Sequence, residues 1–266
     1  MNKKISYIKK ENRKKILLLC DDIRMHSGIA TMAREIVIGT AHHYNWVNLG
    51  AAVNHPEKGK TLDLSADINK QKGIDDASVL VIPNNGYGDA QMVRALLFNH
   101  KPDAVFIFTD PRYWIWLFEM EREIRSKIPI VWLNIWDDYP APVYNKNYYN
   151  SVDTLMGISK QTVNINKIVL GDDAEDKIID YVPHGIDPKT FFPILPDHEK
   201  YNDFLNFKKD LFNNRDINFT VFFNSRNIHR KRPADIILAY QLFLEKLDKE
   251  DAKKCALVMH TAVSDN

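Results

Sequence analysis

A cluster of cationic residues in a single predicted loop is the clearest candidate for a ligand-binding site in this chain. Residues 224–233 read Asn-Ser-Arg-Asn-Ile-His-Arg-Lys-Arg-Pro; they follow the apolar run 219–223 and precede the helical pattern 234–240. In a parallel α/β sheet this loop lies at the carboxyl end of a strand, where ligands bind, and the helix start adds partial positive charge and free N–H groups. Arg226 can contact two phosphate oxygens, and Lys231 can add a point charge. The loop therefore predicts a phosphate or diphosphate site; the alternative is a solvated basic loop.

The overall composition favours no particular charged partner. Of the 266 residues, 45% are hydrophobic and 27% charged, and the formal net charge is +1. These values are typical of a globular protein, and we expect no nucleic-acid partner. The charge is uneven, because residues 1–15 contain seven Lys or Arg and one Glu. A basic N-terminal segment can contact nucleic acid or anionic lipid, so peripheral membrane contact is an alternative. We interpret residues 1–14 as a flexible, solvated terminus.

The cysteines and the histidines predict no metal site. Cys20 and Cys255 both lie in apolar runs, so each is interpreted as a core residue in a reducing compartment. The pair His42-His43 lacks a third ligand at useful spacing. No secretory signal and no run of membrane-spanning length is visible, and we expect a cytoplasmic protein.

Short apolar runs alternate with helix-length amphipathic patterns, which predicts βαβ units and a mostly parallel sheet. The predicted strands of the first part are 15–20, 46–49, 79–82, 104–108, 129–135, 154–158 and 178–182, and the predicted helices are 29–40, 90–98, 113–125 and 160–169. The run 129–135 is apolar on both faces, as a buried parallel strand requires. The fold class is therefore α/β, with a doubly wound, Rossmann-like parallel sheet.

A Pro-rich stretch after residue 182 predicts a linker into a second, incomplete domain. Beyond it come a predicted helix over 201–212, strand 219–223, helix 234–247 and strand 255–259. Two strands are too few to bury a core. We expect an N-terminal domain with its linker over 15–195 and the opening of a second Rossmann-like domain over 196–266.

Several segments, taken in chain order, resemble the retaining glycosyltransferases of the GT-B fold, in the group 1 or family 4-like class. Arg226 and Lys231 match the family segment G-R-x-x-x-x-K-[GR], although Ser225 replaces its first Gly and Arg232-Pro233 its second. The other matches are the loop around Ser-Gly-Ile-Ala at 27–30, the loop 134–140, the segment 152–160 that opens a helix, and Pro-His-Gly-Ile-Asp at 183–187 followed by Phe-Pro at 192–193.

The resemblance implies roles for five residues. Arg226 and Lys231 would hold the donor diphosphate, while Gly28 would lie where the first loop turns beside the inter-domain cleft. Asp137 would face the acceptor and the sugar, though the His often seen in that loop is missing. His184 would reach a phosphate or a sugar; the alternative is that it only caps its Pro-His-Gly turn. Catalysis would thus fall to Asp137, Arg226 and Lys231, with no metal and no cofactor besides the donor substrate.

The implied activity is transfer of a sugar, as in a hexosyltransferase, from a nucleotide-sugar donor to a hydroxyl of a glycan, lipid or protein acceptor, with retention of configuration. One departure matters, because the family places an acidic E-x7-E segment beyond the basic loop and this chain ends before it. We therefore expect a C-terminally truncated fragment. The alternatives are a nucleotide-sugar epimerase on the same fold and a non-catalytic binding or scaffold remnant.

Overall fold

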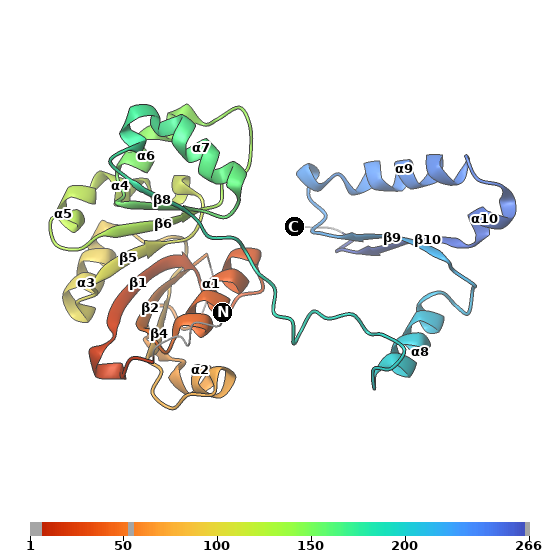
Figure 1. Cartoon of the computed structure of the whole chain (residues 1–266), viewed down its shortest axis with the longest axis horizontal. Coiled ribbons are helices and arrows are strands. Elements are labelled where there is room, and N and C mark those ends of the chain that lie inside the picture. The colour runs from red at the N-terminus through yellow and green to blue at the C-terminus, as the bar shows by residue number, and fades with distance from the viewer. Residues whose placement is uncertain (1–6, 53–55, 264–266) are drawn as a thin grey trace. The chain divides into compact units, whose positions relative to one another are not determined.

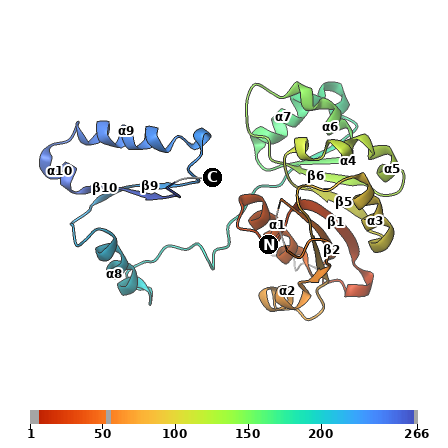
Figure 2. The same ribbon diagram turned by 180° about the vertical axis from the view of Figure 1, so that it is seen from behind.

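The computed structural model describes residues 7–52 and 56–263. The chain divides into two compact units, Met1–Gly185 and Ile186–Asn266. Figure 1 and the reverse view in Figure 2 show a helix-flanked sheet in the first unit and a smaller strand pair with helices in the second. Each unit is described here by itself.

The N-terminal unit is built on one sheet of mostly parallel strands. Its strands are β1 (Lys14–Asp21), β2 (Tyr44–Ala51), β3 (Leu62–Asp63), β4 (Val79–Pro83), β5 (Ala104–Ile107), β6 (Ile130–Asn134), β7 (Thr154–Gly157) and β8 (Ile178–Tyr181). Their order across the sheet is β3-β4-β2-β1-β5-β6-β7-β8, and only the β3–β4 pair is antiparallel among these strands. In the central register Leu17 pairs with Val47 on one side and with Val105 on the other. The predicted α/β class with a doubly wound parallel sheet is confirmed.

Helices cover the two faces of this sheet unequally. The helices are α1 (Gly28–Thr40), α2 (Ser65–Lys72), α3 (Ala90–His100), α4 (Ile115–Glu119), α5 (Glu121–Arg125), α6 (Lys146–Asn150) and α7 (Lys160–Leu170). Alternate residues of β1 enter two cores: Leu17 and Leu19 pack with residues of α3 to α7, and Leu18 and Cys20 with residues of α1 and α2. The strands are therefore apolar on both faces, as buried parallel strands must be. In the described part of the chain, α1 and α2 are the only helices that contribute residues to the second core.

At two places the structure differs from the prediction. The helix predicted over 113–125 is divided into a 3-10 turn at Pro111–Tyr113 followed by α4 and α5. The backbone leaves the helical region at Trp114 (φ −122°, ψ 23°) and at Met120 (φ −100°, ψ 12°), where both side chains are buried. Helix α2 was not predicted, because its sequence is polar and Ile68 is its only buried residue. Tertiary packing overrides local periodicity at both places.

The basic terminus includes an arginine that lies inside the unit. The Arg13 side chain is fully buried; its Nε donates to the Ile8 carbonyl oxygen at 2.6 Å, its Nη1 donates to the Asp76 carbonyl oxygen at 2.8 Å, and its Nη2 pairs with the Asp76 carboxylate. Lys14, the next residue, pairs with Asp103 at the surface. Of the segment predicted to be a flexible terminus, residues 8–13 thus contact the domain, and residues 1–6 lie outside the described part.

The C-terminal unit has two parallel strands and a very small core. Its elements are α8 (Tyr201–Leu211), β9 (Phe219–Asn224), a 3-10 turn (His229–Lys231), α9 (Pro233–Leu244), α10 (Lys249–Lys253) and β10 (Cys255–His260). Residues 182–200, which include the predicted linker, form no helix or strand. The buried apolar cluster comprises Phe212, Ile217 and Ala256.

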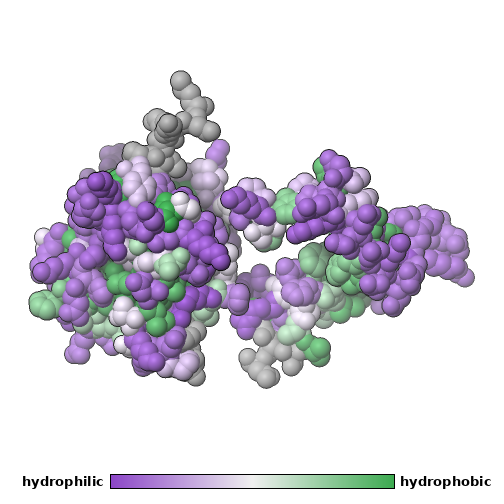
Figure 3. Space-filling model, turned by 90° about the horizontal axis from the view of Figure 1, so that it is seen from below, coloured by the Kyte–Doolittle hydropathy of each residue, from purple (hydrophilic) through white to green (hydrophobic). Residues whose placement is uncertain are grey.

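Much apolar surface of this second unit is uncovered. Phe219 and Phe222 of β9 are more than half exposed, and so are Ile237 and Leu238 on the outer face of α9. Figure 3 shows apolar side chains, in green, on the surface of this unit among polar ones. A helix that is apolar on all sides is normally buried on all sides. We therefore expect these faces to be covered when the protein works.

Candidate functional site

The basic loop lies at the carboxyl ends of both strands of the C-terminal unit. Strand β9 ends at Asn224, and Lys231 closes the 3-10 turn just before α9 begins at Pro233. The end of β10 lies beside this loop, since the Ser225 N–H donates to the His260 carbonyl at 3.3 Å and the His260 ring lies 2.8 Å from the Asn224 amide oxygen. The strand–loop–helix placement predicted for this loop is present.

The cations of this loop differ in their surroundings. Arg226, Arg230 and Lys231 are all exposed, and Lys231 forms no ion pair with the part of the chain that the structure describes. Arg232, in contrast, holds the Asp235 carboxylate at 2.7 Å. Asp235 lies in the first turn of α9, where its charge offsets the partial positive charge of the helix start. Among the described residues, the charge of Arg232 is therefore already offset by Asp235, whereas the charge of Lys231 is open to an added anion.

Arg232 also occupies an unusual backbone conformation. Its φ of 51° and ψ of 48° lie in the left-handed region, which glycine enters at little cost and other residues rarely adopt. The resemblance places Gly or Arg directly after the motif lysine. Arg232 therefore matches the motif while occupying the left-handed conformation that glycine would adopt with less strain.

The other three predicted site residues belong to the N-terminal unit, each after a different parallel strand. Gly28 is the first residue of α1, its helix is capped by the Ser27 hydroxyl, which accepts from the Ala30 N–H at 3.0 Å, and a Cβ at Gly28 would meet open space. His184 follows β8, and its ring meets the Phe108 ring edge-on at 5.8 Å between centroids. Partial burial lowers the pKa of His184, which favours its neutral form.

Asp137 is exposed in the loop after β6. Its backbone carbonyl accepts from the Gln161 side chain at 2.9 Å, while its carboxylate has no hydrogen-bonding partner among the described residues. Gly28, Asp137 and His184 thus all follow carboxyl ends of strands in one sheet, and in the described structure no hydrogen bond or ring contact joins them to one another. Only Arg226 and Lys231 are brought into one loop.

The same edge of the sheet holds a buried carboxylate that the sequence analysis did not select. Asp21, the last residue of β1, accepts from the Ser27 hydroxyl at 2.8 Å and from the Tyr87 hydroxyl at 3.2 Å. In the described structure no cation is paired with it. Burial, together with the negative charge of Asp21, raises the pKa of Tyr87, so its hydroxyl stays a donor.

The neighbouring carboxylate, Asp22, is fully paired. Arg24 donates to it through Nε at 2.9 Å and through Nη2 at 2.7 Å, and its Nη1 reaches Glu57 at 3.0 Å. Asp22 packs against Gly50 of β2, where a Cβ would approach the Asp22 side chain to 2.9 Å. Asp22 is therefore a structural residue, and Asp21 is the one with unused hydrogen-bonding capacity.

Two tyrosines from different loops stack beside Asp21. The rings of Tyr87 and Tyr113 lie 4.2 Å apart at 12°, and Tyr87 meets the buried Trp114 edge-on at 5.4 Å. Tyr87 lies between Gly86 and Gly88, with φ of 70° and 80°. The Gly-Tyr-Gly triplet, three residues after the predicted strand 79–82, was a signal in the sequence that could have identified this loop. The stack spans loops after β4 and β5, and this pairing is not readable from the sequence.

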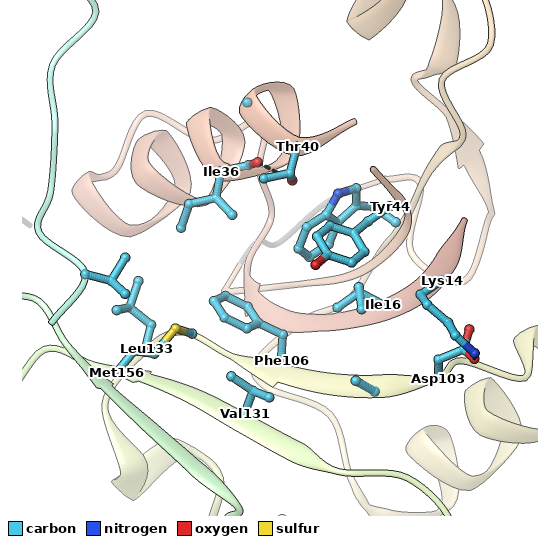
Figure 4. A pocket seen from close by; sticks show the side chains of 14 residues that line it. Lys14, Ile16, Ile36, Thr40, Tyr44, Asp103, Phe106, Val131, Leu133 and Met156 are labelled. Carbon is cyan, nitrogen blue, oxygen red and sulfur yellow. Dashed lines mark hydrogen bonds and ion pairs between the residues drawn. The ribbon is translucent and has the colours of Figure 1, made fainter. Parts of the chain in front are cut away.

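A separate cavity of the N-terminal unit lies on the less covered face of the sheet. It is an apolar groove of about 760 Å³. Figure 4 shows Phe106, Val131, Leu133 and Met156 from the strands facing Ile36 of α1, with the Lys14–Asp103 ion pair at one end. The groove has no cluster of polar groups for chemistry. In the described residues, no group of three or more His, Cys, Asp or Glu could hold a metal ion, and no helix is long and apolar enough to cross a membrane.

Comparisons with known proteins give structural relatives only. No protein-family model matches the chain, and no curated protein sequence matches it. Among solved structures, HepE (Alr3699) of Anabaena in complex with UDP and glucose is similar with a TM-score of 0.58 and 11% identity, over 94% of this chain and 62% of that one. The N-terminal domain of Candida albicans trehalose-6-phosphate phosphatase gives a TM-score of 0.57 and 9% identity, over 93% and 64%.

At such low identity these similarities concern the fold. The chain has the α/β, GT-B-like architecture predicted from the sequence, with a Rossmann-like sheet followed by elements of a second unit. It spans less than two thirds of the length of both relatives.

Proposed function

We propose that the chain belongs to a glycosyltransferase that moves a sugar from a nucleotide-sugar donor to an acceptor hydroxyl. The observation that carries the proposal is the basic loop at the carboxyl ends of β9 and β10, with Arg226 and Lys231 both exposed before α9. A diphosphate there could meet two side-chain cations and the N–H groups of a helix start. The fold shared with HepE, which was solved with UDP and glucose, supports a uridine diphosphate as the first ligand to test.

The chemistry follows from where charge develops. When the bond between the anomeric carbon and the diphosphate breaks, negative charge grows on the leaving group, and Arg226 and Lys231 would stabilise it. The resemblance supports retention of configuration and a hexose as the transferred sugar. It also supports a position for the acceptor near Gly28 and Asp137 in the N-terminal unit, with His184 within reach of a phosphate or a sugar. A glycan, a lipid headgroup or a protein hydroxyl could each be the acceptor.

Calorimetric titration with UDP tests the donor site. Arg226→Ala and Lys231→Ala should each remove a charge-assisted contact worth about 1.5–3 kcal/mol, which weakens affinity by roughly one to two orders of magnitude. Arg230→Ala is the matched control: the residue has the same charge, is also exposed and is adjacent to Lys231, but the motif assigns it no contact. Circular dichroism of each variant checks that the C-terminal unit is folded. Equal, small losses for all three variants would mean that the loop is only a charged surface.

A further inference from the structure

The aromatic stack beside Asp21 is arranged from the core to the surface. Trp114 is fully buried, Tyr87 packs edge-on against it, and Tyr113 stacks flat on Tyr87 and is half exposed. In the described structure no other ring contacts Tyr113. Tyr87 is held by its packing on Trp114 and by its hydroxyl, which donates to Asp21, so the outer tyrosine rests on a ring with two contacts of its own. A flat, supported and exposed ring at the ligand-binding edge of a parallel sheet offers a platform for a flat partner with an apolar face.

The carboxylate at the edge of this platform has capacity left. Asp21 is buried, with 7% of its surface exposed, and in the described residues its two oxygens accept one hydrogen bond each, from Ser27 and from Tyr87. An ionised carboxylate has about four lone-pair sites, so each oxygen can accept another donor. A buried charge without a paired cation is costly, and additional hydroxyl donors would reduce that cost. Asp22, one residue away, has no such need because Arg24 already pairs with it.

A sugar ring satisfies both features at once. The C–H groups on one side of a pyranose form an apolar patch that packs on an aromatic face, and its hydroxyls point outward as donors to carboxylates. We propose that Tyr113, supported by Tyr87, is a carbohydrate subsite that stacks one sugar ring, and that Asp21, which accepts from the Tyr87 hydroxyl, accepts from a hydroxyl of that sugar. The assignment of this sugar to the acceptor rests on the proposed function, which places the nucleotide in the other unit. The binding of a sugar at Tyr113 is independent of the proposed function.

The subsite is tested by titrating the full chain with methyl glycosides of the common hexoses. Binding is measured by ligand-observed saturation-transfer NMR. Tyr113→Ala should weaken binding about tenfold, because the stacking face is lost, whereas Tyr113→Phe should keep most of it. Asp21→Asn keeps the shape of the side chain and should also weaken binding about tenfold through the lost charge-assisted contacts. Phe98→Ala is the control, since Phe98 is an exposed aromatic residue on α3 and should not matter. Tryptophan fluorescence checks the folding of each variant.

The possible outcomes separate this proposal from the proposed function. If no methyl glycoside binds, or if Tyr113→Ala has no more effect than Phe98→Ala, the subsite is refuted even when UDP still binds. If Tyr113→Ala weakens binding but Asp21→Asn does not, the role of the carboxylate is refuted. If the glycosides bind as expected and UDP does not bind at all, the subsite stands and the glycosyltransferase proposal fails. Tyr113→Ala should leave UDP affinity unchanged.

Discussion

Replacing Arg13 by Ala should destabilise the N-terminal unit far more than replacing its neighbour Lys14. The Arg13 guanidinium is fully buried, and its removal leaves the carbonyl oxygen of Ile8, the carbonyl oxygen of Asp76 and the Asp76 carboxylate without their donor. Breaking a fully buried ion pair costs about 3–5 kcal/mol. Because the Asp76 side chain is 26% exposed, water can partly replace the lost donor, and we expect a loss of about 2–4 kcal/mol.

Lys14 gives the matched control for this substitution. It is also cationic and also paired, with Asp103 at 2.7 Å, but its side chain is 72% exposed. An exposed pair of this kind contributes about 0–1 kcal/mol, so Lys14→Ala should change the unfolding free energy little. All five tryptophans lie in the N-terminal unit, so tryptophan fluorescence during urea unfolding reports on this unit alone. Similar midpoints for Arg13→Ala and Lys14→Ala would refute the reasoning.

The same ion pair predicts a dependence on pH. Burial acts to raise the pKa of Asp76, but hydrogen bonds from Tyr7 and Arg13 and the charge of Arg13 outweigh it, and the folded-state pKa lies below its ordinary value. A carboxyl group with a depressed folded-state pKa contributes stability above its unfolded pKa of about 3.9 and loses it as the pH falls through the folded value. The stability difference between the native chain and Asp76→Asn should therefore be constant near neutral pH and should shrink in acid. A difference that grows in acid would contradict this sign.

Two further predictions concern the C-terminal unit. The positive φ at Arg232 should reverse the usual order in which alanine is more stabilising than glycine. Both Arg232→Gly and Arg232→Ala lose the ion pair with Asp235, so the glycine variant should be about 1 kcal/mol more stable in thermal unfolding followed by circular dichroism. An alanine variant of equal or greater stability would contradict this. The exposed apolar face of α9 should drive self-association as the protein concentration rises. In sedimentation experiments Leu238→Lys should reduce this association, whereas Phe98→Lys, at an exposed residue of the other unit, should not. A chain that stays monomeric at all concentrations would count against the prediction.

Most of the fold could be predicted from the sequence, because the strands are apolar on both faces and are therefore recognisable as buried parallel strands. The run 129–135 has that pattern, and the structure places β6 in the middle of a parallel sheet with Trp132 fully buried. Where helices carry little of the core, as α2 does with only Ile68 buried, the pattern is lost. Where buried side chains interrupt a helix, as at Trp114 and Met120, periodicity predicts continuity that packing does not allow.

The candidate site was predictable only within single loops. Arg226 and Lys231 are close in sequence, so the position of their loop at a strand end followed from local patterns. The stack of Tyr87 on Tyr113 joins loops after β4 and β5, which are not neighbours in the sheet. The contact of Tyr87 with Asp21 again joins separate loops. Such combinations depend on strand order, which local residue types do not specify.

The contact between Gly50 and Asp22 restricts how this protein can diverge. A side chain at position 50 would enter the space of the Asp22 carboxylate and would displace the guanidinium of Arg24 that holds it. Accepting alanine at position 50 would therefore require a smaller residue at position 22, which would in turn leave Arg24 without its main acceptor. We therefore expect substitutions at positions 50 and 22 to be tolerated only in combination, because each side chain occupies the space that the other would need.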